Sequence, residues 1–191
     1  IKKGMRLLEL GCGRGELAVE YARKGAIVVG VDYSKDGITL AKSYLSKQPK
    51  AIQKKVTFFV MDAKKLRFKD NTFDVITSVD VFEHLYKEEL EMVMKEVARV
   101  LKPDGILFVH TETNKLYLDF THHFWAYPID TFLININTFL TKKRYPGLPK
   151  DPRNDLHKTQ HVTEPTFFYL QSLFKRYHFA GSITAIIPHK N

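Results

Sequence analysis

Hydrophobic and polar positions form two alternating patterns over the first 111 residues. Short apolar, β-branched runs are typical of strands buried on both faces, and they occur at Arg6–Leu10, Ile27–Asp32, Val56–Asp62, Phe73–Val79 and Ile106–Thr111. Segments with apolar residues at helical spacing separate most of these runs, one ending at Lys24 and others spanning Lys35–Lys47 and Glu88–Leu101. The alternation predicts an α/β fold with a doubly wound, mostly parallel sheet and helices on both faces.

The pattern changes after the fifth predicted strand. Residues 113–160 are rich in aromatic side chains, include an apolar, helix-like run at Phe132–Leu140, and carry a proline-rich segment. A segment this long between sheet elements is usually functional. We expect it to be a substrate-binding cap inserted into a single domain that spans residues 1–191. A last helix is predicted after Thr163, followed by a strand at Ser182–Ile187.

Composition narrows the class of protein further. The 191 residues are 44% hydrophobic and 27% charged, values that exclude disordered, collagen-like and coiled-coil proteins. No apolar run reaches the 18 residues of a membrane-spanning helix. The net charge of +9 is spread along the chain, so nucleic-acid binding is not favoured, while peripheral membrane contact stays open. Cys12 is the only cysteine, which excludes an internal disulfide and favours a cytoplasmic location.

The strongest chemical signal is a glycine-rich turn between the first predicted strand and helix. The segment reads Leu-Leu-Glu-Leu-Gly-Cys-Gly-Arg-Gly from Leu7 to Gly15, and such glycines let a backbone approach a ligand closely. A dinucleotide fingerprint would need glycine where Glu16 stands, and a phosphate-binding loop would need Gly-Lys-Ser or Gly-Lys-Thr. The acidic Glu9 before the turn is unfavourable beside a pyrophosphate but suits a cation.

This segment resembles the first motif of class I S-adenosylmethionine-dependent methyltransferases. Further segments resemble later motifs of that family in the right order, including Phe73–Ser78 and Leu101–Ile106. The resemblance implies that Asp32 binds the ribose hydroxyls, that Tyr33 supports the adenine, and that Asp62 contacts the adenine amino group. Either aspartate alone could simply cap a turn, but both at the ends of adjacent strands favour a cofactor site. The implied cofactor contacts are Glu9, Gly11, Cys12, Gly13, Asp32, Tyr33, Asp62, Ala63 and Ser78. Cys12 is interpreted as a small buried filler of the turn rather than a nucleophile.

A second group of polar residues follows the fourth predicted strand. If this turn is helical, Asp80, Glu83 and His84 share one face. The group is similar to the Glu-x-x-Glu-His segment of ubiquinone-biosynthesis O-methyltransferases and small-RNA 2′-O-methyltransferases, which bind a divalent metal ion with a further histidine. His161 would be that histidine here, although Asp80 stands where those families have glutamate. Alternatively, Glu83 and His84 rim the active site without a metal, and His84 or His161 acts as a general base.

These features predict an enzyme that transfers a methyl group from S-adenosylmethionine to an oxygen of a small apolar or aromatic acceptor. Such a reaction is a direct in-line displacement that depends mostly on positioning. Methylation of RNA ends or glycans is one alternative. A non-catalytic S-adenosylmethionine-binding partner protein is another. Because the family's sheet has further elements, we expect the natural protein to continue beyond both ends of this sequence.

Overall fold

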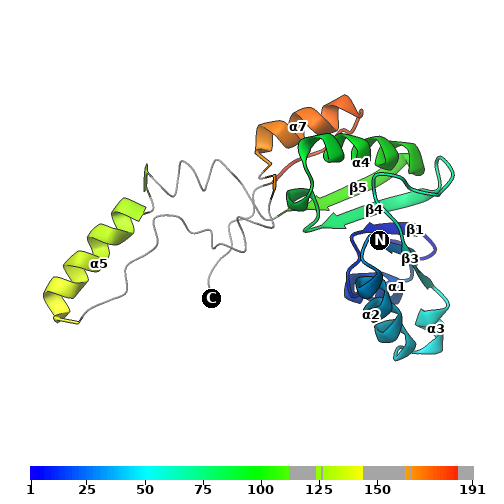
Figure 1. The fold of residues 1–191 in the computed structure, drawn as a ribbon, viewed down its shortest axis with the longest axis horizontal. Helices are drawn as coiled ribbons and strands as arrows, with labels where there is room; N and C mark the ends of the chain where they lie inside the picture. Colours follow the sequence, from blue (N-terminus) through cyan, green and yellow to red (C-terminus); the bar gives the residue numbers. More distant parts are fainter. Residues whose placement is uncertain (112–123, 126, 144–161, 164, 185–191) are drawn as a thin grey trace. The chain divides into compact units, whose positions relative to one another are not determined.

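The computed structural model describes residues 1–111, 124–125, 127–143, 162–163 and 165–184 (Figure 1). The chain divides into two compact units, Ile1–Thr111 and Glu112–Asn191. The boundary lies next to the start of the cap predicted at 113–160. The expectation that residues 1–191 form one domain stays a prediction.

The first unit is built around a five-stranded parallel sheet. Its strands are β1 (Arg6–Leu10), β2 (Ile27–Asp32), β3 (Val56–Val60), β4 (Phe73–Val79) and β5 (Leu101–His110). They lie in the order β3-β2-β1-β4-β5, and every neighbouring pair is parallel. The chain winds outward from β1 to β3 and then returns to the other side of β1 with β4. The carboxyl ends of β1 and β4 therefore flank the switch point where such sheets bind ligands.

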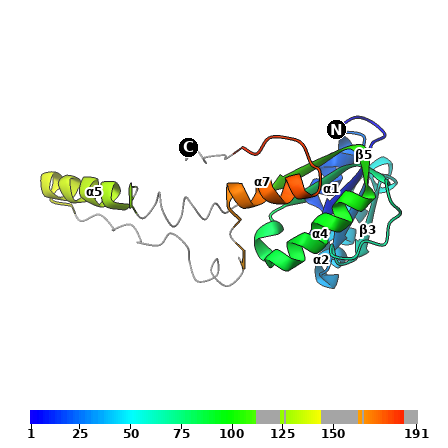
Figure 2. The same cartoon turned by 90° about the horizontal axis from the view of Figure 1, so that it is seen from above.

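Helices cover both faces of this sheet, as the hydrophobic pattern predicted. They are α1 (Glu16–Arg23), α2 (Lys35–Ser46), the short α3 (Lys50–Gln53), the 3-10 helix η1 (Phe82–His84) and α4 (Lys87–Val100). Figures 1 and 2 show α4 on the opposite side of the sheet from α1 and α2. On the α1 and α2 face, buried Ala18, Ala22 and Ala41 belong to one cluster with the strand residues Leu7 and Val28. Small side chains on the helices let them approach the sheet closely.

Three details differ from the predicted pattern. Helix α3 was not predicted. Strand β5 begins at Leu101, which pairs with Phe73, and pairing resumes only where Ile106 meets Val75. The predicted turn at residues 102–105 is thus an irregular stretch inside β5. Of the predicted strand at Ser182–Ile187, residues 182–184 are not in a strand, and the remainder lies outside the described residues.

The second unit contributes two described helices. Helix α5 (Tyr127–Thr141) confirms the helix-like run in the predicted cap. Helix α7 (Phe167–Arg176) is capped at its amino end by Thr166, whose hydroxyl accepts a hydrogen bond of 3.2 Å from the Tyr169 backbone N–H. Within the described ranges, neither these helices nor those of the first unit are long and apolar enough to cross a membrane.

The glycine turn is closely packed at one of its glycines. Gly15 is buried and has a φ of 82°, in the left-handed region that glycine adopts without strain. A Cβ atom at this position would lie 2.6 Å from Cζ of Phe58 in β3. Gly13 also has a positive φ, of 48°, but a Cβ there would meet nothing within 4 Å. The two glycines thus differ in packing while sharing a left-handed backbone.

Replacing Gly15 with alanine should destabilise the fold more than replacing Gly13 with alanine. Both variants force an alanine into the left-handed region, at about 1–2 kcal/mol. Only Gly15→Ala also overpacks the contact with Phe58, which should add about 1–3 kcal/mol to the loss of unfolding free energy. Urea unfolding of both variants measures the difference. Equal stability losses would contradict this view of the turn.

Candidate functional site

Backbone hydrogen bonds tie the glycine turn after β1 to the end of β2. The Cys12 N–H donates to the Val31 carbonyl at 3.0 Å, and the Gly15 N–H donates back to the Cys12 carbonyl at 2.8 Å. The Gly13 N–H donates to Oδ2 of Asp32 at 2.9 Å. The turn is therefore held in place by groups on the neighbouring strand.

Asp32 uses both carboxylate oxygens to fix two separate turns. While Oδ2 accepts from Gly13, Oδ1 accepts from the Ser34 N–H at 2.8 Å. Its own carbonyl accepts a 2.8 Å hydrogen bond from the Met61 N–H at the end of β3. Each carboxylate oxygen retains a further lone pair, and the side chain is only partly buried. Asp32 thus has capacity to accept hydrogen bonds from a ligand's hydroxyl groups.

Glu9 is a buried carboxyl group beneath the glycine turn. It is only 3% exposed, and its Oε2 has no hydrogen-bond partner. Burial raises the pKa of Glu9 to about 8, the Ala18 backbone N–H opposes this, and Glu16 and Asp32 add to the rise. Next to it on β4, the hydroxyls of Thr77 and Ser78 are likewise buried and unpaired. Unpaired polar atoms thus gather where β1 meets β4.

Cys12 is buried, in agreement with the interpretation of its side chain as a filler. Burial, with smaller contributions from Glu9 and Asp32, raises the pKa of its thiol well above the ordinary value. A thiol in such surroundings stays protonated at neutral pH and is a poor nucleophile. Cys12 can therefore contact a ligand through its backbone but does not supply a reactive sulfur.

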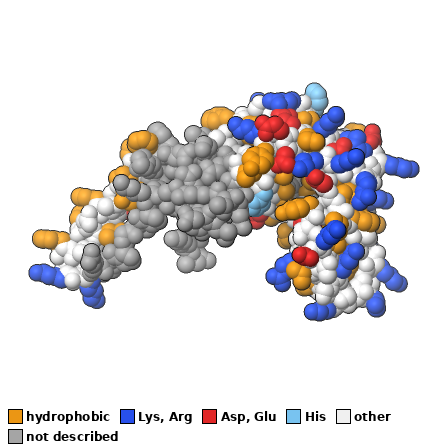
Figure 3. Space-filling view, viewed as in Figure 1, with side chains coloured by type: hydrophobic (Ala, Val, Ile, Leu, Met, Phe, Trp, Pro, Cys, Tyr) orange, Lys and Arg blue, Asp and Glu red, His pale blue; other side chains and the backbone are white. Residues whose placement is uncertain are grey.

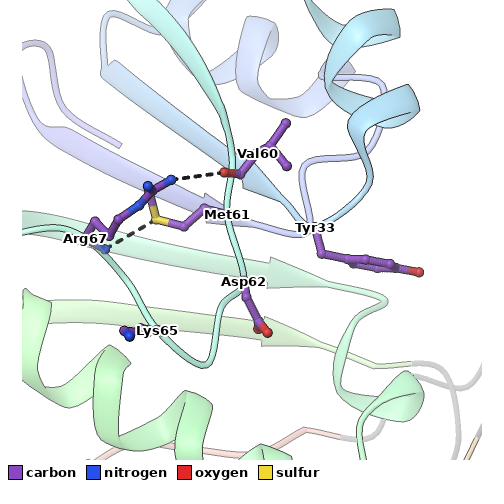
Figure 4. A pocket seen from close by; sticks show the side chains of 6 residues that line it. All are labelled: Tyr33, Val60, Met61, Asp62, Lys65 and Arg67. Atoms are coloured by element: carbon purple, nitrogen blue, oxygen red, sulfur yellow. Dashed lines mark hydrogen bonds between the residues drawn. The ribbon is translucent and has the colours of Figure 1, made fainter.

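A hollow of about 420 Å³ lies beyond the ends of β2 and β3 (Figure 4). It is lined by Tyr33, Val60, Met61, Asp62, Lys65 and Arg67. Tyr33 is 84% exposed, so its ring is available to a ligand. Asp62 accepts a 2.9 Å hydrogen bond from the Lys64 N–H and also lies 3.6 Å from the Lys64 ammonium. Ala63, between them, is partly buried. The hollow offers an aromatic face beside a carboxylate.

The predicted shared face of Asp80, Glu83 and His84 does not form. Asp80 has a left-handed backbone with φ of 54°, and η1 begins only at Phe82. Glu83 is 1% exposed and accepts a 2.8 Å hydrogen bond from the Thr111 hydroxyl, while His84 is exposed. The reason is that one left-handed residue breaks the helical spacing on which the prediction depended.

The residues present do not fit a metal site in the part of the chain that the structure describes. No group of three histidine, cysteine, aspartate or glutamate side chains gathers there in a way that could hold an ion. His161, the fourth predicted ligand and one of the two predicted bases, lies outside the described residues. Its role stays a prediction.

Sequence reasoning missed the partner of Asp80. Oδ1 of Asp80 lies 2.7 Å from Nδ1 of His110, the last residue of β5. The sequence could have indicated this contact only through position, because Asp80 and His110 both stand at the carboxyl ends of strands in the predicted parallel sheet. No short motif joins two residues that lie 30 positions apart.

The raised pKa of Glu9 predicts a pH-dependent stability. Below about pH 4.5 the carboxyl is protonated in both folded and unfolded chains. As the pH rises towards 8, the unfolded chain ionises first, so the folded state loses stability relative to a Glu9→Gln variant. The gap between 4.5 and about 8 corresponds to roughly 4–5 kcal/mol. Denaturant unfolding of both proteins from pH 5 to 8 measures it, and parallel pH profiles would contradict it.

The chain is similar to known methyltransferases in sequence. Residues 8–109 match the family described as "Methyltransferase domain". The ubiquinone biosynthesis O-methyltransferase of Pelagibacter ubique is 37% identical over 118 residues, which cover 61% of this chain and 46% of that protein. The enzyme of the same name from Rhizobium etli is 35% identical over 57% of this chain and 42% of its own length. The chain thus spans less than half the length of these curated relatives.

Solved structures agree with this relationship. An S-adenosylmethionine-dependent methyltransferase from Methanosarcina mazei superposes with a TM-score of 0.65 at 25% identity, covering 93% of this chain and 80% of that one. The YcgJ protein of Bacillus subtilis gives a TM-score of 0.64 at 25% identity, covering 94% of this chain and 63% of that one. The glycine turn, the sheet order and the family match together show that the chain belongs to the class I S-adenosylmethionine-dependent methyltransferases.

Proposed function

We propose that this chain transfers the methyl group of S-adenosylmethionine to an oxygen of a small apolar or aromatic acceptor. The observation that carries the proposal is the order of groups along the carboxyl edge of the sheet. The hollow with Tyr33 and Asp62 lies at β3 and β2, Asp32 ends β2, and the glycine turn and Glu9 belong to β1. An extended cofactor with adenine, ribose and a cationic end needs its binding groups in this sequence.

The residues present fit the cofactor. The aromatic face and carboxylate of the hollow suit the adenine, and the free lone pairs of Asp32 suit the ribose hydroxyls. The unpaired Oε2 of buried Glu9 suits the positively charged amino-acid end, because a nearby cation favours the ionised carboxylate. The bound cofactor supplies a methyl group on a positively charged sulfur. Gly11, Gly13, Ala63 and Ser78 complete the proposed contacts.

The protein's own tasks in such a transfer are positioning and proton removal. A methyl displacement needs the acceptor oxygen in line with the transferred carbon, and correct orientation supplies much of the acceleration. A phenol with a pKa near 10 also has to lose its proton at neutral pH, which a positioned histidine can accelerate by roughly 10²- to 10⁴-fold.

Exposed apolar side chains on helix α5 of the second unit support the proposal that the acceptor is apolar. Helix α5 has no buried residue among those described, and large apolar side chains are exposed along it (Figure 3). These are Ile129, Phe132, Leu133, Ile136, Phe139 and Leu140, with Phe124 and Trp125 just before the helix. Such a surface suits an aromatic or aliphatic molecule better than a sugar. The relatives from Pelagibacter ubique and Rhizobium etli are ubiquinone biosynthesis O-methyltransferases, and this similarity also supports an oxygen acceptor.

The basic residues of the first unit do not favour RNA as the acceptor. A second hollow of about 510 Å³ is lined by Arg6, Arg67, Lys69 and Lys102 together with Phe68, Asn71 and Thr72. Arg6 begins β1, and Thr72 and Lys102 flank the starts of β4 and β5, so this hollow lies at the amino edge. Asp74 also binds the Lys102 ammonium at 2.6 Å. Apart from Arg67, which lines both hollows, the basic residues there would hold phosphates away from the cofactor groups. Cytoplasmic location and peripheral membrane contact stay predictions.

Replacing Asp32 with alanine should weaken S-adenosylmethionine binding by about 1–3 kcal/mol, or roughly 5- to 150-fold, because a charged acceptor is lost. Isothermal titration of the wild-type and variant proteins measures the affinity. Asp36→Ala, at an exposed position in the first turn of α2, is the matched control and should bind as the wild type does. Unchanged affinity in Asp32→Ala would rule out the assigned ribose contact.

A product screen with and without chelator tests the reaction itself. We expect methyl transfer to phenols and apolar alcohols rather than to RNA ends or oligosaccharides. We also expect turnover to survive EDTA, because two of the predicted metal ligands, Asp80 and Glu83, contact His110 and Thr111 instead. Mass spectrometry identifies the products. Cofactor binding without any product would instead support a non-catalytic partner protein. Loss of turnover with EDTA and its recovery with magnesium, manganese or zinc would restore the metal hypothesis.

A further inference from the structure

We propose that Asp80 and His110 form the base of this active site, with His110 accepting the proton of the acceptor hydroxyl and Asp80 positioning its ring. The inference rests on the proposed function and names a catalytic residue for it. Neither the glycine motif nor the similarity to relatives assigns a role to His110. The geometry at the ends of β4 and β5 points to this pair.

Two contacts between neighbouring strand ends fix the pair. Val79 of β4 is in register with His110 of β5, and the Asp80 N–H donates to the His110 carbonyl at 3.1 Å. The side chains then meet at 2.7 Å between Oδ1 of Asp80 and Nδ1 of His110. Because backbone and side chain are both joined, the imidazole has a defined orientation. The next residue, Thr111, donates its hydroxyl hydrogen to Oε2 of Glu83 at 2.8 Å, which joins the segments after β4 and β5 a second time.

The contact also selects the tautomer of a neutral ring. An ionised carboxylate only accepts hydrogen bonds, so Nδ1 has to carry the hydrogen that faces Asp80. The other nitrogen, Nε2, then keeps its lone pair and is the basic atom. A carboxylate that orients a histidine in this way also stabilises the imidazolium that forms when the ring takes a proton.

The backbone of Asp80 is unusual in a way that fits a functional position. Its φ of 54° lies in the left-handed region, which aspartate visits more readily than most residues. Such strained conformations cluster at active sites. Here the left-handed residue is the one whose carboxylate meets the histidine. The next residue, Val81, fills the space where a side chain on Gly11 would stand.

The position of the pair along the sheet agrees with the order of the cofactor groups. The adenine hollow, Asp32 and the glycine turn run from β3 through β2 to β1, so the reactive end points towards β4 and β5. Asp80 and His110 stand at the carboxyl ends of those two strands. Their side chains are 46% and 43% exposed, which leaves room for a small acceptor.

In the proposed step, proton removal by His110 accompanies methyl transfer to the acceptor oxygen. The acceptor O–H bond breaks and its proton passes to Nε2 of His110, while an oxygen lone pair forms the new bond to the methyl carbon. The carbon–sulfur bond breaks, and its electron pair stays on sulfur, which becomes a neutral thioether. The imidazolium, held by Asp80, returns its proton to water. No further reactant is needed.

The test compares acceptors of different acidity in three variants. With phenols of pKa near 10, His110→Gln should lower kcat by roughly 10²- to 10⁴-fold. With phenols acidic enough to be ionised at the assay pH, the loss should be less than tenfold, because no base is required. Asp80→Asn should show the same dependence on acidity with a smaller loss, since asparagine also tolerates the left-handed backbone. His178→Gln, an exchange of the same kind in the second unit, should leave both reactions unchanged.

The outcomes separate this inference from the proposed function. If the wild-type protein binds the cofactor but methylates no oxygen acceptor, the proposed function fails and the base assignment fails with it. If the wild type is active and His110→Gln slows acidic and weakly acidic phenols equally, only the base assignment fails. A dependence on acidity in His84→Gln instead of His110→Gln would also overturn it. Nitrogen NMR of His110 provides a substrate-free check, because a neutral ring protonated at Nε2 would contradict the proposal.

Discussion

The carboxylate of Asp32 is the contact on which the cofactor half of the molecule depends. One of its oxygens holds the turn after β1 and the other holds the turn after β2, while its carbonyl anchors the chain leaving β3. Three loops from three strands are thereby fixed by one residue. These hydrogen bonds act together with the packing of the glycine turn against Phe58 and Val81 to set the shape of the loops. A ligand that approaches Asp32 meets a surface that is already formed.

Glu9 differs from Asp32, because its carboxyl group is buried and one of its oxygens has no hydrogen-bond partner. Burial raises the pKa of this carboxyl group, and one of its oxygens and two hydroxyls lie at the junction of β1 and β4 without hydrogen-bond partners. Each unpaired buried polar group typically lowers stability by about 1–3 kcal/mol. The small alanines of α1 and α2 and the apolar strand residues supply the packing that tolerates this loss.

Much of the first unit could be predicted from its sequence because its signals are local. Runs such as Ile27–Asp32 and Phe73–Val79 are bounded by residues that end strands, and the structure reproduces both ranges. The glycine turn was also recognisable, since left-handed glycines and the acid before them are adjacent in the chain. The helical face of Asp80, Glu83 and His84 was wrong, because a single left-handed residue breaks the periodicity without changing the residue types. The pairing of Asp80 with His110 depends on the register between two strands, which no local pattern contains.

The residues suited to the cofactor and the residues proposed to act on the acceptor lie mostly in different parts of the chain. Most groups suited to the cofactor come from β1, β2 and β3 and the turns that follow them, with Ser78 added from β4, whereas His110 and everything after Thr111 come later in the chain. The described hydrogen bonds of Asp32 all join it to other residues of the first unit, namely Gly13, Ser34 and Met61. We propose that acceptor preference can therefore be changed through residues after Thr111 while the groups suited to the methyl donor are kept.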